Sequence, residues 1–533
     1  MVVVELRPWR AAGPHVARLA GAVRPRLARA AAAARPRVAR LVQAAKPQLT
    51  RVTKPKPGWS WQYTATAATA GLALAAGVVT AAGPWDSTGQ RTAERDRAAA
   101  LERTGGADHG RTGRTTAGTP RPAPSAVSVL AGLGGAGKSA PAGRAPDREA
   151  VAGLVEPLLD DAALGSHHAA VVVDVATGAR LYAAGADDAL TPASTTKLAT
   201  AVAALTALGP DHRLTTRAAL EPDTGELVLV GGGDPTLTAR KRSDGSASLR
   251  DLADRTAAAL KKRGLEQVTL SYDTTLYAGD EMHPIGVNDN LAPVSALMTD
   301  EARTDDSTSG PAPRAADPAA DAARTFAALL ADHGIRTTAP GPSKATARAA
   351  TLATVSSPPL SALVERMLTN SDNDLAEALA RHTAVATGKP ADFDGAAAAV
   401  EARLEQLGLP TEGAVFQDGS GLDRADRLTA GLLTALLAEA GERAHPELRA
   451  VLTGLPVAGF TGTLSSRYTD GAAGVVRAKT GTLTGVNTLA GTVVDQDGRL
   501  LAFAFLASGT TDPMAAQSAL DRTASALASC GCG

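Results

Sequence analysis

Cysteine is almost absent from this chain of 533 residues, and the two that occur, Cys530 and Cys532, stand in the C-terminal run Cys-Gly-Cys-Gly. Two cysteines with one residue between them exclude the paired spacing of a zinc site. The nine histidines show no metal-binding spacing either, so we expect no metal. Because a bridge across one residue would be strained, we expect the pair to lie in a frayed tail.

Net charge is also absent, since 54 Lys and Arg balance 54 Asp and Glu, and no global field favours nucleic acid. Residues 1–60 are an exception, with thirteen basic residues against the single acid Glu5. They repeat short Ala, Arg and Pro groups. This pattern is typical of a disordered basic arm or of helical pieces on an anionic membrane surface, and both interpretations stay open.

Charged residues are missing from residues 62–83, which are flanked by Trp59, Trp61, Tyr63 and Trp85. The length and the aromatic edges are typical of a membrane span, although much Ala, Gly and Thr makes its hydrophobicity modest. A buried helix and a cleaved signal are the alternatives, and the long preceding arm disfavours a signal. We expect an uncleaved signal-anchor of a single-pass cell-membrane protein, with the basic arm inside and the rest exported.

Large apolar residues are nearly missing from residues 84–147, which are rich in Thr, Gly, Arg, Ala and Pro. Such a composition cannot bury enough surface to fold, so we expect a disordered spacer. Residues 132–139 match the phosphate-loop pattern, but Pro141 and Pro146 break the helix that should follow. We therefore expect no nucleotide binding.

Folding signals begin near Asp147. The pattern predicts a helix over 151–164, a strand over 168–175 and a return strand at 180–182. The apolar spacing that follows Ser194 predicts a buried helix. Together these elements predict an α+β layer of sheet and helices.

From about residue 215 to 350 the chain changes to short strands and turns with a helix over 249–263, which predicts an inserted, mostly-β region over 216–354. Helical spacing returns at 360–368 and, after a polar break, from Leu375. Three strands and a last helix then complete an antiparallel sheet flanked by helices. Their expected ranges are 474–483, 488–494, 500–506 and 515–527.

Three polar clusters stand in order at the edges of these elements. They are Ser194-x-x-Lys197, Ser371-Asp372-Asn373 and Lys479-Thr480-Gly481. Ser194 and Lys197 lie one helical turn apart at a helix start, so the amine reaches the hydroxyl, and burial of the amine would activate it as a base. Each cluster alone is an ordinary cap, turn or strand end. Their joint order on rigid elements indicates a catalytic site.

This constellation resembles that of penicillin-binding proteins and serine β-lactamases. About residues 150–525 resemble, more closely, the D-alanyl-D-alanine carboxypeptidase/endopeptidase family of low-molecular-mass class C penicillin-binding proteins. Ser194 and Ser371 are 177 positions apart, which suits the extra domains that this family inserts there. A compact β-lactamase has no such room. Further segments that carry the resemblance are 231–237, 292–297, 418–422, 455–459, 462–464 and 478–483.

The resemblance implies a penicillin-binding-protein-like catalytic domain over 148–215 and 355–529. It implies a serine-type D-Ala-D-Ala carboxypeptidase, with endopeptidase action as an addition, that needs no cofactor. The substrate would be a peptidoglycan stem peptide, and β-lactams would be covalent inhibitors.

The resemblance also implies residue roles. Ser194 would attack the substrate carbonyl and Lys197, as a neutral amine, would accept its proton. Ser371, between the amines of Lys197 and Lys479, would pass a proton to the leaving D-alanine, and Asn373 would bind the substrate amide. Backbone N–H groups of Ser194 and Thr482 would form the oxyanion hole. The terminal carboxylate would be bound by Lys479, Thr480, Gly481 and Thr482.

Two departures from the family pattern are visible. Members commonly carry a tryptophan in the inserted segment near the site, where residues 282–286 of this chain read Met-His-Pro-Ile-Gly. Asp423 and Asp426 stand where Ser and Asn are more usual.

Two other functions stay open. One is a serine β-lactamase, although no Glu-x-x-Leu-Asn segment follows Ser371. The other is a catalytically weak protein that tethers the membrane to peptidoglycan.

Overall fold

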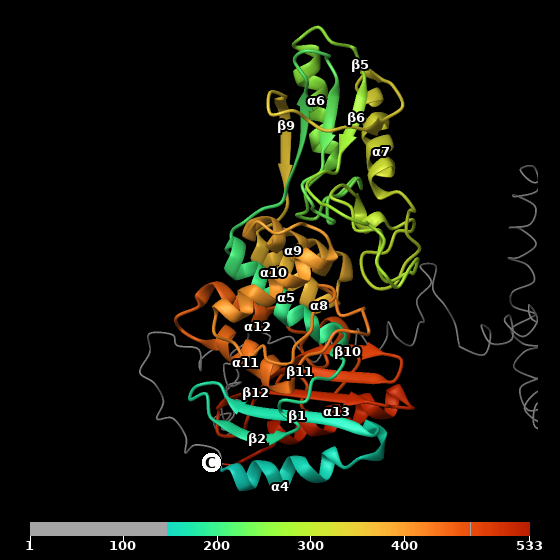
Figure 1. Ribbon diagram of the computed structural model, residues 1–533. Coiled ribbons are helices and arrows are strands. Elements are labelled where there is room, and N and C mark those ends of the chain that lie inside the picture. Colours follow the sequence, from blue (N-terminus) through green and yellow to red (C-terminus); the bar gives the residue numbers. More distant parts are fainter. Residues whose placement is uncertain (1–146, 469–470, 533) are drawn as a thin grey trace, which may run out of the picture. The chain divides into compact units, whose positions relative to one another are not determined.

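The computed structural model describes residues 147–468 and 471–532 (Figure 1). Within these ranges no helix combines the length and the apolar character that crossing a membrane requires. Four features expected from the sequence lie outside the described residues: the basic arm 1–60, the span 62–83, the spacer up to residue 146 and the phosphate-loop match 132–139.

Five strands form an antiparallel sheet in the order β10-β11-β12-β1-β2, which confirms the antiparallel sheet expected from the sequence. They are β1 (His167–Asp174), β2 (Arg180–Ala184), β10 (Arg477–Leu483), β11 (Val486–Val494) and β12 (Leu500–Ser508). β1 pairs with β12 along its whole length, so the two ends of the described chain share one sheet. β10, which carries the third motif, is the edge strand of this sheet, and on its outer side its first residue, Arg477, pairs with Val457.

Helices cover both faces of this sheet (Figure 1). On β12, Phe503 and Phe505 point into the core shared with α4 and α13, whereas Ala502 and Ala504 point into the core shared with α11. This alternation is that of a strand buried on both faces. The covering helices are α4 (Arg148–Leu159), α11 (Ala430–Gly441) and α13 (Pro513–Ala528), and the short α12 (Arg449–Thr453) packs on α11.

Four more helices lie between this sheet and a second one (Figure 1). They are α5 (Lys197–Leu208), α8 (Leu360–Asn370), α9 (Asn373–Thr387) and α10 (Phe393–Gln406). α5 is the central one, because every residue from Lys197 to Leu205 is buried and the helix contacts its neighbours α8, α9, α10 and α11. Its Ala, Val and Leu side chains make it apolar all round, which buries the lysine at its start.

The inserted region holds a second sheet in the order β8-β6-β4-β3-β9, with parallel and antiparallel neighbours. The region expected to be mostly β is mixed instead, because two helices pack together against this sheet. The α7 sequence does carry helix signals, since Asp317 caps it and Pro318 begins it. The elements are β3 (Thr215–Leu220), β4 (Leu227–Val230), α6 (Leu249–Lys261), β5 (Gln267–Val268), β6 (Leu270–Asp273), α7 (Pro318–Asp332), β7 (Arg336–Thr337), β8 (Gly341–Pro342) and β9 (Ala350–Ser356).

The C-terminal tail is packed, so the expectation of a frayed tail is wrong. Cys530 and Cys532 are joined as a disulfide, and both are buried in the core that contains α13. The backbone N–H of Asp147 donates to the carbonyl of Cys532 at 2.6 Å, and that of Gln496 donates to Cys530 at 3.0 Å. These partners are distant in sequence, and they fix the tail by satisfying its backbone carbonyls.

Candidate active site

Ser194 lies in a short 3-10 turn, Ala193–Thr196, that leads directly into α5. Ala193, just before it, has φ of 49°, a left-handed conformation that a residue other than glycine adopts only when its surroundings enforce it. The enforcing contact is at Pro192, whose carbonyl accepts from the hydroxyls of Thr195 at 2.7 Å and Thr488 at 2.8 Å. The turn that presents Ser194 is therefore held against β11.

Gly481 of the third motif allows this turn to approach β10. A Cβ at this position would lie 2.1 Å from Thr488 Oγ1 and 2.7 Å from the carbonyl oxygen of Pro192, both closer than real atoms come. Glycine is required here by the close approach of the strand, not by an unusual φ angle. The role of Gly481 in this arrangement is thus to bring the third motif beside Ser194.

Lys197 is fully buried one helical turn after Ser194, and its Nζ donates to Ser194 Oγ at 3.1 Å. Two other oxygens hold the amine: Asn373 Oδ1 at 2.7 Å and the carbonyl of Ser420 at 2.6 Å. Burial lowers the pKa of Lys197 to about 8, although nearby carboxylates such as Asp418 oppose the change. The neutral amine that can accept a proton from Ser194 therefore forms as the pH approaches 8, far below the usual range for a lysine.

The second motif occupies the junction between α8 and α9. Ser371 ends α8 in the left-handed conformation, with φ of 57°, and Asp372 caps α9 by accepting from the N–H of Leu375 at 3.0 Å. Ser371 Oγ accepts from Lys479 Nζ at 2.8 Å. Asn373 is engaged at both ends of its amide, by Lys197 and by the carbonyl of Asn290, to which its Nδ2 donates at 2.9 Å.

Lys479 is the second fully buried amine of the site. It also donates to the carbonyl of Thr480 at 2.7 Å. Burial, followed by the charge of Lys197, holds the pKa of Lys479 well below its usual range. Two buried amines that disfavour each other's charge are suited to exchanging a proton through a hydroxyl such as that of Ser371.

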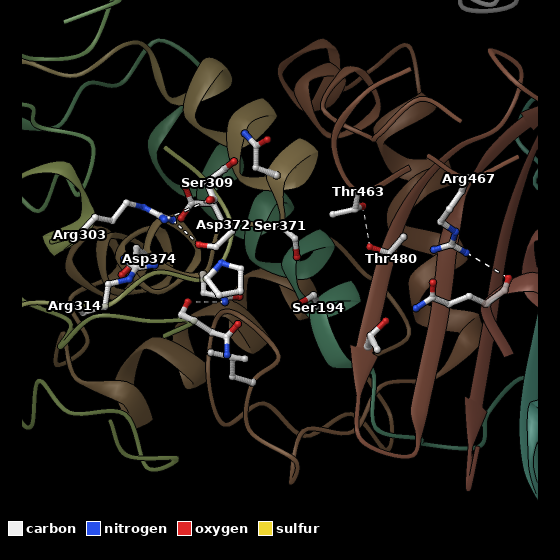
Figure 2. A pocket seen from close by; sticks show the side chains of 18 residues that line it. Ser194, Arg303, Ser309, Arg314, Ser371, Asp372, Asp374, Thr463, Arg467 and Thr480 are labelled. Atoms are coloured by element: carbon white, nitrogen blue, oxygen red, sulfur yellow. Dashed lines mark hydrogen bonds and ion pairs between the residues drawn. The ribbon is translucent and has the colours of Figure 1, made fainter. Parts of the chain in front are cut away.

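A cavity of about 370 Å³ opens over these motifs. Figure 2 shows Ser194 and Ser371 between two walls, one formed by Arg303 and Arg314 of the inserted region and the other by Thr480 with its neighbour Thr463. The hydroxyl of Thr480 donates to that of Thr463 at 2.9 Å. Of the residues singled out from the sequence, those that line this cavity are Ser194, Ser371, Asn373, Thr480 and Thr482.

A buried acid lies behind Lys197. The carboxylate of Asp418 accepts from the backbone N–H groups of Ser420 at 3.0 Å and Gly421 at 2.5 Å, and it contacts His283 Nε2 at 2.9 Å. These contacts shape the loop whose carbonyl holds the Lys197 amine. Asp418 lies in segment 418–422, which carries the resemblance to the family. His283 lies in segment 282–286, where the chain differs from the family pattern, and nothing else in the sequence marked it.

Two more acids lie near the site: Glu377, which was missed from the sequence, and Asp426, which was noted there only as a departure from the family pattern. Glu377 lies on α9 one turn after Asn373 and accepts from the N–H of Gly419 at 3.1 Å, while Asp426 accepts from the N–H of Gln417 at 2.7 Å. Burial raises the pKa of Glu377 to about 7 and that of Asp426 to about 9. An acid one helical turn beyond a motif residue, and so on the same face of the helix, is the signal that would have found Glu377.

Among the described residues, two groups of acids and histidine lie close enough to share a metal ion: one of His283, Glu377 and Asp418, the other of Glu301, Asp372 and Asp374. In the first group both oxygens of Asp418 already accept from protein donors. In the second group arginines pair with all three acids. Protein donors thus satisfy both groups without an ion.

Comparison with known proteins gives a consistent result. The sequence pattern of the D-Ala-D-Ala carboxypeptidase 3 (S13) family matches residues 151–313 and 302–528. Carboxypeptidase DacB from Mycolicibacterium smegmatis is 39% identical over 381 residues, which cover 68% of this chain and 80% of that protein. A carboxypeptidase from Mycobacterium tuberculosis is 36% identical over 430 residues, covering 78% of this chain and 90% of that protein.

A solved structure shares the fold. Penicillin-binding protein 4 from Haemophilus influenzae aligns with a TM-score of 0.58 at 22% identity, over 70% of this chain and 97% of that one. The expected fold class, an α+β domain like that of penicillin-binding proteins, is confirmed by this likeness. With the family pattern covering most of the described residues and two relatives above 30% identity, the chain belongs to the D-Ala-D-Ala carboxypeptidase 3 (S13) family.

Proposed function

We propose that this chain is a serine-type D-Ala-D-Ala carboxypeptidase that removes the terminal D-alanine of peptidoglycan stem peptides through an acyl-enzyme at Ser194. The observation that carries the proposal is the 3.1 Å contact between Ser194 Oγ and the buried amine of Lys197. A hydroxyl beside an amine of lowered pKa is an activated nucleophile. Membership of the family supports the same chemistry.

Acylation needs two proton transfers. As Ser194 Oγ forms its bond to the carbonyl carbon of the penultimate residue, its proton passes to the neutral amine of Lys197. The bond to the terminal D-alanine then breaks, and the leaving amine takes a proton from Ser371 Oγ. Ser371 recovers its proton from the ammonium group that Lys197 acquired in the first transfer, while Lys479 Nζ holds the Ser371 hydroxyl at 2.8 Å. Water later hydrolyses the ester and restores Ser194.

The remaining residues would hold the substrate. Thr480 and Thr482 line the cavity, and their hydroxyls suit the terminal carboxylate as hydrogen-bond donors. The backbone N–H groups of Ser194 and Thr482 would stabilise the oxyanion. One hydrogen of the Asn373 Nδ2 group donates to the carbonyl of Asn290, and the other would donate to the substrate amide.

The function is tested with the full chain, a fluorescent penicillin and a stem peptide that ends in D-Ala-D-Ala. We expect one stable label per chain on the peptide containing Ser194, release of D-alanine, and loss of that release after treatment with penicillin. Rapid turnover of penicillin would indicate a β-lactamase instead. If the chain is not labelled and releases no D-alanine, the remaining hypothesis is the catalytically weak protein that tethers the membrane to peptidoglycan. A cross-linked muropeptide, run in parallel, measures endopeptidase action.

The proposal extends to location. The charge-free stretch 62–83, with basic residues before it, supports a single span that puts the active site outside the cytoplasm. Alkaline phosphatase requires export to form its disulfides, so a fusion after residue 147 is expected to be active in cells. A fusion after residue 60 is the control and is expected to be inactive. Equal activity of both fusions, or of neither, would contradict the span.

A further inference from the structure

The second motif is held by a segment of the inserted region that also forms one wall of the cavity. Asn373 donates to the carbonyl of Asn290, and the N–H of Ala292 donates to Asp374 Oδ1 at 3.0 Å. Arg314 donates to the other oxygen of Asp374 at 2.8 Å. The start of α9, which carries the motif, thus depends on residues more than 50 positions earlier in the chain.

The same segment contains a backbone conformation that needs an explanation. Asp300, Glu301 and Ala302 have φ values of 52°, 56° and 53°, so three consecutive residues other than glycine lie in the left-handed region. Each carries a steric cost that glycine would avoid. Such strain persists only where the surroundings enforce it, and it concentrates at functional sites.

Glu301 is the centre of this turn, and its side chain is only 2% exposed. One carboxylate oxygen accepts from Arg303 Nε at 2.8 Å, and the other pairs with Arg366 of α8. The same Arg366 reaches Asp372 of the second motif at 3.3 Å. Arg366 thus bridges the carboxyl groups of Glu301 and Asp372, whose oxygens lie within 4.8 Å of each other. Figure 2 shows Arg303 directed towards Asp372, beside Ser371.

We propose that Glu301 is a positioning residue that holds the second motif, through Asp372, in the geometry that acyl transfer to Ser194 needs. The inference rests on the proposed function, because it concerns the placing of Ser371 and Asn373, which flank Asp372. A displacement of about 1 Å in such groups can lower a rate by about 100-fold. The strained turn delivers the Glu301 carboxyl to Asp372.

The charged groups around Glu301 predict how the support depends on pH. Arg303 of its own turn and Arg366 of α8 favour the carboxylate, whereas Asp372 and Asp374 of α9 disfavour it. Burial, reinforced by the charge of Asp372, raises the pKa of Glu301 to about 8. Below that pH, protonated Glu301 donates to Asp372; above it, two like charges face each other, and the support weakens.

Two substitutions test the proposal by the rate at which penicillin acylates the full chain between pH 6.5 and about 9, spanning the pKa argued above. Glu301→Gln keeps a donor to Asp372 and cannot ionise, so its rate divided by the wild-type rate is expected to rise with pH through about 8. Glu301→Gly relieves the left-handed strain but removes the carboxyl, and its rate is expected to fall about tenfold or more at every pH.

Glu221→Gln is the matched control. Glu221 is also buried in the inserted region, at 7% exposure, and accepts from Thr346 N–H at 2.6 Å and Thr346 Oγ1 at 2.7 Å, away from the motif. Its rate ratio is expected to stay flat with pH. Rates are measured per labelled molecule, so partial unfolding does not imitate the effect.

Three outcomes would overturn the proposal. They are a flat ratio for Glu301→Gln, a wild-type rate for Glu301→Gly, and loss of folded protein in both variants, which would mean that Glu301 serves the fold and not the motif. Failure of the proposed function can be distinguished from failure of this inference, because the wild-type chain itself would then not be acylated by penicillin.

Discussion

Replacing Lys197 by methionine is expected to lower the rate of penicillin acylation by about 10²–10⁴-fold, the range that a positioned general base contributes. Methionine fills a similar volume in a fully buried place, so the fold should survive. The carbonyl of Ser420 and the amide oxygen of Asn373 lose their donor, which costs about 1–3 kcal/mol for each of them.

The pH dependence gives this prediction a second readout. Because the pKa of Lys197 is lowered to about 8, the neutral amine forms as pH rises, and the wild-type acylation rate should increase up to that pH. Lys197→Met should lose this rising limb. Stopped-flow labelling with penicillin measures the acylation rate and its dependence on pH. Lys344→Met, on the exposed surface, is the control, and Ser194→Ala gives the lower limit of the rate. A Lys197→Met rate within tenfold of wild type would contradict the assignment of the base.

Replacing Gly481 by alanine is expected to lower acylation by about 100-fold, without touching any reacting group. The added Cβ would meet Thr488 Oγ1 at 2.1 Å and the carbonyl of Pro192 at 2.7 Å. Thr488 cannot turn away freely, since it donates to that same carbonyl at 2.8 Å. β10 must therefore move from the Ser194 turn, with a loss of about 1–3 kcal/mol in the free energy of unfolding.

Gly341→Ala is the control for this prediction, because Gly341 also lies in a strand, β8, and a Cβ there would meet nothing within 4 Å. Its stability is expected to stay within about 0.5 kcal/mol of wild type, with an unchanged acylation rate. Urea unfolding and penicillin labelling measure the two effects. Equal labelling rates for Gly481→Ala and Gly341→Ala would show that the close approach does not matter for the site.

The sequence predicted most helices and strands correctly where the apolar pattern extended over many residues. The strand expected at 168–175 is β1, His167–Asp174, and its run of consecutive apolar residues reflects burial on both faces. The helix expected over 151–164 ends at Leu159 instead, because Asp161 caps a separate turn by accepting from the N–H of Ala163 at 2.9 Å. Capping side chains set where such helices end, and the spacing of apolar residues does not predict these ends.

The inserted region was harder to predict for a related reason. Its strands of two to seven residues are too short for a clear period, as β5 (Gln267–Val268) and β9 (Ala350–Ser356) illustrate. The Ala-rich α7 has few large apolar positions to mark its face. Pairing between strands far apart in sequence decides this sheet, and local pattern carries little information about that pairing.

By itself, the sequence determined the local part of the site: a helix start brings Lys197 to within reach of Ser194 whatever the rest of the chain does. Only the tertiary structure decided the partners of that amine, Asn373 and Ser420, which lie 176 and 223 positions away. It alone decided that Glu301 meets Asp372. The physical reason is that burial and charge pairing set the pKa values of these groups, and both arise when distant elements pack together.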